Sequence, residues 1–95
     1  MYESGRGVPQ SWAEAAIWFR NAADQGLADA QYDLGRTYAD GRGVQRDYVR
    51  AYLWFSLATG QGDQRAAHSR SILISLMSPA QIAEGQKLAR EWKPK

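Results

Sequence analysis

Apolar residues recur along this chain at the spacing of one helical face, i, i+3, i+4 and i+7, and the same face occurs twice. Its members are Ala15, Trp18, Phe19 and Ala22 in the first copy and Ala51, Trp54, Phe55 and Ala58 in the second. Because this spacing is typical of amphipathic helices, we expect helices over residues 11–25 and 48–61. We also expect both tryptophan–phenylalanine pairs to pack between neighbouring helical hairpins.

Three more helices are predicted, over residues 28–40, over residues 64–77 and from Pro79 to the last turn before Pro94. Two of them have inner faces marked by apolar or small residues at helical spacing: Ala30, Leu34 and Tyr38, and then Ile82, Gly85, Ala89 and Trp92. Residues 1–4 have the pattern of the last turn of a preceding helix. Since short loops make successive helices antiparallel neighbours, we predict an all-α fold of five helices in about two and a half hairpins.

Capping residues mark the predicted helix starts. The expected N-caps are Ser11, Asp47, Asp63 and Ser78. Both serines are followed three residues later by Glu or Gln, which is the capping-box pattern. Gly35 lies in the middle of a predicted helix, where glycine costs about 1 kcal/mol relative to alanine. We therefore expect the backbone of a neighbouring element to approach Gly35 closely.

The second copy of the pattern follows the first by 36 residues. Of the 30 pairs formed by residues 1–30 and the residues 36 positions later, 12 are identical, whereas composition alone would give roughly two or three. A fixed period of this length is typical of stacked repeat units. We therefore predict a single repeat domain with three parts: a partial repeat at 1–26, a full repeat at 27–62 and a C-terminal capping hairpin at 63–95.

Residue types and motifs argue against catalysis. The chain has no cysteine and a single histidine, His68, so we expect no metal site and no cofactor. No paired carboxylates and no nucleophile with a neighbouring base stand out, and no catalytic residue is predicted. The glycine turns at 5–7 and 41–43 each follow a predicted helix rather than a strand, which favours turn geometry over phosphate binding.

Charge is distributed unevenly, although the net charge is only +2. Residues 1–47 hold five basic and seven acidic side chains, and residues 48–95 hold seven basic and three acidic ones. This density of basic residues is too low to predict nucleic-acid binding, and no apolar run is long enough to predict a membrane span. No signal-peptide pattern occurs at the start, so the cytoplasm is the default expectation unless an upstream signal sequence precedes this chain.

The residues around the second glycine turn resemble the Sel-one-like repeat family, which is related to the tetratricopeptide repeats. The matching elements are Ala-Gln-Tyr-x-Leu-Gly-x-x-Tyr at 30–38, Gly-x-Gly-Val at 41–44, and Asp47-Tyr48 followed by Ala51, Trp54-Phe55 and Ala58. The resemblance implies a right-handed α/α superhelix and a role in holding proteins together rather than in catalysis. Leu27 departs from the pattern, because it fills the N-cap position that Asp63 fills one unit later.

The tetratricopeptide pattern, transferred through Leu34 and Tyr38, also implies which residues line the concave surface. They are Asp29, Tyr32 and Arg36, joined one period later by Arg65 and His68. Guanidinium groups bind carboxylates or phosphates through paired hydrogen bonds, so we expect this groove to bind an acidic peptide or a helix of another protein. An ordinary solvated face is the alternative for each residue.

The predicted helix at 11–25 lacks most of the partner that its second copy has. A buried tryptophan or phenylalanine covers about 150–250 Å², and leaving such a pair half uncovered forfeits several kcal/mol. We therefore expect Ile17 and Trp18 to be covered by a second copy of the chain, by a swapped helix or by upstream sequence. The leading hypothesis is an interaction module, and the alternative is a structural or oligomerisation unit or a fragment of a longer repeat protein.

Overall fold

A computed structural model describes residues 9–94 of the chain, with side chains from residue 12 onward. This part forms five helices and contains no strand: α1 (Pro9–Asp24), α2 (Ala28–Asp40), α3 (Tyr48–Gly60), α4 (Gln64–Ile74) and α5 (Pro79–Glu91). The all-α prediction is confirmed. The helical turn predicted at residues 1–4 lies outside the described residues.

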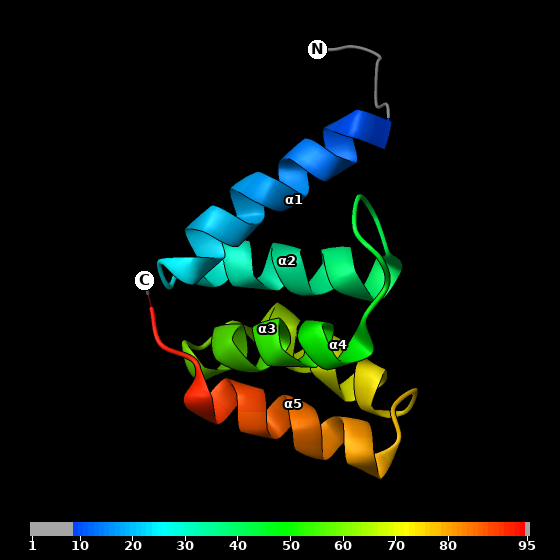
Figure 1. Cartoon of the computed structure of the whole chain (residues 1–95). Coiled ribbons are helices and arrows are strands. Elements are labelled where there is room, and N and C mark those ends of the chain that lie inside the picture. Colours follow the sequence, from blue (N-terminus) through cyan, green and yellow to red (C-terminus); the bar gives the residue numbers. More distant parts are fainter. Residues whose placement is uncertain (1–8, 95) are drawn as a thin grey trace.

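Helices α1, α2 and α3 follow one another from one end, α4 lies beside α3, and α5 lies at the other end against α3 (Figure 1). Helix α3 is central, because it packs against α2, α4 and α5, whereas α1 packs mainly against α2. Both core clusters therefore include side chains of α3. Phe55 belongs to the cluster shared with α4, and Trp54 belongs to the cluster shared with α1 and α2.

Most predicted helix starts are correct. The Asp47 carboxylate accepts a hydrogen bond from the Arg50 amide, and Asp63 caps α4 in the same way. Ser78 and Gln81 form the predicted capping box at α5. The capping box predicted at Ser11 is wrong, because α1 begins two residues earlier, at Pro9. Proline suits the first turn of a helix, since its fixed φ is already helical and no amide partner is needed there.

Three predicted helix ends lie too far along the chain, the first of them by one residue, because α1 ends at Asp24 and not at residue 25. Helix α3 ends at Gly60 and not at Gln61, and α4 ends at Ile74, three residues before Met77. Met77 is nevertheless buried beside Leu73, so its apolar side chain belongs to the core without being helical. The predicted helix therefore ran too far, into the turn before α5, because the apolar pattern continues to Met77.

The tryptophans of the two tryptophan–phenylalanine pairs differ in solvent exposure. Trp54 and Phe55 are 3% and 2% exposed, as predicted for packing between hairpins. The same prediction is wrong for Trp18, which is 72% exposed. Helix α1 instead turns small side chains toward α2, because Ala16 and Ala23 are its buried residues. Small residues allow these two helices to approach closely, and they leave Trp18 on the open side.

Gly35 also differs from its prediction. A Cβ atom placed there would lie 2.6 Å from two ring carbons of Phe55. The group that approaches Gly35 is therefore an aromatic side chain of α3 and not a backbone. Gly85 of α5 has the same relation to the ring of Tyr52, at 2.5 Å. Helix α3 therefore makes two close contacts of the same kind, in which one of its aromatic rings packs against a glycine of α2 or of α5.

Candidate functional site

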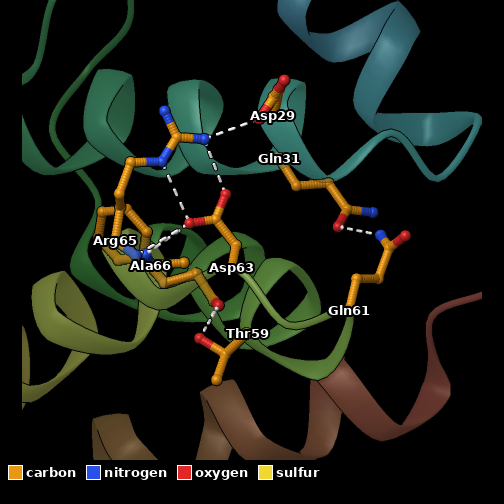
Figure 2. A network of polar contacts seen from close by, with 8 residues as sticks. Asp29, Gln31, Thr59, Gln61, Asp63, Arg65 and Ala66 are labelled. Atoms are coloured by element: carbon orange, nitrogen blue, oxygen red, sulfur yellow. Dashed lines mark hydrogen bonds and ion pairs between the residues drawn. The ribbon is translucent and has the colours of Figure 1, made fainter.

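Four of the five predicted groove residues lie together: Asp29, Tyr32 and Arg36 on α2, and Arg65 in the first turn of α4. The Arg65 guanidinium reaches from α4 to α2, with its Nη2 atom 2.7 Å from Oδ1 of Asp29. Figure 2 shows this bond beside the contacts that the same guanidinium makes with Asp63. Residues 29 and 65 are one repeat period apart, so this ion pair joins equivalent positions of successive units.

Asp63 holds Arg65 in place. Its carboxylate accepts hydrogen bonds from Nη2 and Nε of Arg65 at 2.8 and 3.2 Å, and it also caps the amides of Arg65 and Ala66. The hydrogen bond from the Arg65 side chain is the main reason why the pKa of Asp63 lies below its ordinary value. Arg65 is therefore bound by two carboxylates of its own chain.

The Tyr32 ring lies beneath two guanidinium groups. The central carbon of Arg65 is 4.4 Å from the ring centroid, and that of Arg36 is 5.9 Å away. Tyr32 also packs against the buried Phe55, with 6.0 Å between the ring centroids. Since cations are attracted to the faces of aromatic rings, Tyr32 positions both arginines above the core of the middle unit.

Arg36 and His68 are the predicted groove residues whose charged or polar groups stay available. Arg36 is exposed and makes no ion pair with any residue between 9 and 94. His68 is exposed one turn along α4 from Arg65, and within that range no hydrogen bond, ion pair or ring contact joins it to the other four. The structure therefore groups Asp29, Tyr32, Arg36 and Arg65, and places His68 at the edge.

An apolar hollow of about 260 Å³ continues from Arg36 along the gap between α2 and α4. Tyr48, Phe55 and Leu73 contribute to its walls, and Asp40 lines it as well. Two rim residues, Ile72 near the end of α4 and Leu76 in the turn after it, are 55% and 59% exposed. We call this hollow, together with the Tyr32–Arg65 end, the α2–α4 groove.

Sequence reasoning missed the apolar half of the α2–α4 groove. A signal was present, because Ile72 and Leu76 follow Arg65 by 7 and 11 positions, which are steps along one helical face. The exposure of these two residues could not be deduced without the position of α2.

A network of side-chain amides connects the end of α3 to α2 and to the loop before α2. Gln31 is fully buried, and its Oε1 atom accepts a hydrogen bond of 2.9 Å from Nε2 of Gln61 (Figure 2). Gln61 Nε2 also donates to the carbonyl of Gly26 at 2.7 Å, in the loop before α2. Because a buried amide without partners is costly, these bonds specify how the end of α3 meets the loop between α1 and α2.

Replacement of Asp63 by alanine is expected to lower the free energy of unfolding by about 1–2 kcal/mol, because α4 loses its N-cap. Its pKa is lowered in the folded state, so the stabilisation is full above the unfolded-state pKa and is lost as the pH falls through the folded-state pKa. Urea unfolding at neutral and acidic pH measures both effects.

Asp29→Ala is the matched control for Asp63→Ala, because it removes only an ion pair with an exposed carboxylate. Exposed pairs contribute about 0–1 kcal/mol. Equal losses of stability in the two variants would contradict the role assigned to Asp63.

Other kinds of site are absent from the part of the chain that the structure describes. Between residues 9 and 94, no group of three or more His, Asp or Glu side chains could hold a metal ion. Within the same range, none of the helices has the length and apolar character that crossing a membrane requires.

Stacked helices that repeat with a period of 36 residues define a helical repeat protein. The chain belongs to the Sel1 repeat family, whose model matches residues 1–27 and 28–63. Sel1 repeats generally mediate protein–protein interaction and are typically non-catalytic scaffolds. No curated protein sequence matches the chain.

A similar solved structure is that of c5321, a protective antigen present in uropathogenic Escherichia coli strains, which displays an SLR fold. It aligns with a TM-score of 0.85 and 37% sequence identity over 93% of this chain. This chain spans 19% of the length of that protein. The comparison supports an all-α repeat superhelix.

Proposed function

We propose that this domain is an interaction module that binds an amphipathic peptide or helix of another protein in the α2–α4 groove. The observation that carries the proposal is the exposed pair Ile72 and Leu76 beside Arg36, at the rim of one hollow. Exposed apolar side chains rimmed by polar groups are typical of interaction surfaces. An amphipathic helix placed in such a groove would bury its apolar face there.

The charges at the site indicate where an acidic side chain of the partner would bind. Arg65 already has two carboxylate partners, Asp29 and Asp63, so it adds little attraction for a further anion. Arg36 makes no such pair within the described residues and lines the apolar hollow. We propose that the bound segment has one acidic side chain near Arg36 and apolar side chains one or two turns away.

Selection of random peptides displayed on phage provides a test that needs no known partner. Peptides selected on the domain should share an acidic residue next to an apolar pair. Ile72→Asp should weaken their binding about tenfold or more, because it places a charge at the centre of the contact. Arg36→Glu should weaken binding of the same peptides, measured by fluorescence polarisation.

Two variants serve as matched controls for the peptide measurements. Ile74→Asp makes the same chemical change on α4, but Ile74 does not line the hollow. Lys87→Glu makes a charge reversal on the exposed side of α5. The proposal is rejected if Ile74→Asp and Ile72→Asp weaken binding equally while both remain folded.

Assembly through α1 is a second candidate function, because a specific observation favours it. Trp18 and Ile17 are 72% and 61% exposed, although their equivalents one period later, Trp54 and Leu53, are buried. We propose that another helix of the same repeat type, from a second copy or from the same longer polypeptide, covers this face of α1.

Light scattering over a wide range of protein concentrations tests whether the second copy is the partner. The average mass should rise with concentration for the unchanged chain but not for Trp18→Lys, because the charged side chain prevents burial. Ile74→Lys is the control for an added surface charge. A mass that stays monomeric at every concentration would contradict self-association of this chain.

A further inference from the structure

A second hollow, of about 200 Å³, lies on the other side of α2, between that helix and α1. Its aromatic walls are Trp12 and Phe19, and its charged groups are Asp33, Asp40, Arg36 and Arg42. Arg36 lines this hollow as well as the α2–α4 groove, so a segment that crosses α2 at Arg36 would reach both.

One wall of this hollow, formed by Trp12 and Asp40, already binds the guanidinium group of the chain's own Arg42. The guanidinium carbon of Arg42 lies 4.7 Å from the centroid of the Trp12 ring, and its Nε atom lies 3.9 Å from Oδ2 of Asp40. An aromatic face together with a carboxylate is the usual environment of a guanidinium group. Trp12 and Asp40 thus already hold one arginine from the loop after α2.

Asp33 is a second carboxylate in the same hollow, and no ion pair or side-chain hydrogen bond satisfies it within residues 9–94. Its neighbour Arg36 instead lies near the ring of Tyr32. Partial burial is the main reason why the pKa of Asp33 is raised, and the opposing charges of Arg65 and Arg36 do not cancel this effect. A cation bound beside Asp33 would therefore offset a desolvation cost that the fold already bears.

We propose that the hollow between α1 and α2 binds an arginine side chain of the partner, stacked against Trp12 or Phe19 and paired with Asp33. The inference rests on the proposed function in one respect, that the arginine belongs to the segment bound in the α2–α4 groove. Arginine fits better than lysine, because its planar group stacks on aromatic rings and pairs with carboxylates at the same time.

The site is tested directly with N-acetyl-arginine N-methylamide, without any knowledge of the partner. Titration followed by NMR should give a saturable shift of the Trp12 indole N–H and of the Asp33 amide. The neutral isostere N-acetyl-citrulline N-methylamide should give none. Asp33→Asn and Trp12→Ala should each weaken binding about two- to fivefold, the range for partly exposed ion pairs and cation–π contacts.

Arg42→Ala gives a result that a merely structural role would not produce. Removal of the resident guanidinium frees the Trp12 face and Asp40, so it should strengthen binding of the arginine probe. The inference is overturned if the probe causes no saturable shift, if citrulline binds equally well, or if Asp33→Asn has no effect in a folded domain.

The test separates this inference from the proposed function. Ile72→Asp should leave binding of the arginine probe unchanged, because Ile72 lines only the α2–α4 groove. Peptides that bind the groove with no coupling to Asp33 would refute the arginine site alone. Probe binding without any groove-binding peptide would refute the proposed function alone.

Discussion

Trp54→Ala is expected to lower the free energy of unfolding by about 3–5 kcal/mol, the usual cost of removing a buried aromatic side chain. Trp54 lies in the core cluster with Leu34, and its ring meets that of Trp92 edge-on, with centroids 6.0 Å apart. A small domain has a total stability of about 5–15 kcal/mol. Urea unfolding followed by circular dichroism measures the loss.

Trp18→Ala makes the same chemical change one repeat period earlier and is the matched control. Because Trp18 is exposed on α1, its removal should change the stability by no more than about 0.5 kcal/mol at concentrations where the chain is monomeric. A loss near that of Trp54→Ala would contradict the described packing of α1. Trp54→Phe should give a smaller, measurable loss if Trp54→Ala does not fold.

Gly35→Ala is expected to destabilise the domain by about 1–2 kcal/mol, although alanine is the better helix former. The new methyl group would overlap the ring of Phe55, and overpacking of this kind costs about 1–3 kcal/mol. The gain in helix propensity of about 1 kcal/mol offsets only part of that cost. The midpoint of urea unfolding should therefore fall.

Gly60→Ala is the control for the Gly35 prediction. Gly60 is the last residue of α3, and a Cβ atom there would meet nothing within 4 Å. This variant should be neutral or more stable by up to about 1 kcal/mol, because only the propensity term remains. A stabilising Gly35→Ala would show that Phe55 moves aside easily, and the tight contact between α2 and α3 would then be wrong.

Much of the candidate site could be predicted because repeat periodicity relates residues that are far apart in sequence. The period of 36 residues brought Arg65 to the position of Asp29, and the two side chains do pair. The direction of Arg65 could not be predicted, since it depends on the Asp63 carboxylate at the start of the same helix. The exposure of Leu76 was also hidden, because it depends on the gap between α2 and α4.

The amino-acid sequence by itself determined the local features: the five helices between residues 9 and 94, three of their N-caps and the repeat of one unit by the next. These features depend on neighbours within a few residues, so residue type and spacing suffice. Only the tertiary structure decided that Trp54 is buried and Trp18 is exposed, although both occur in the same motif. Burial depends on which helix lies opposite the side chain. Helix α3, which carries Trp54, packs against α5 as well as α2, whereas α1, which carries Trp18, packs mainly against α2.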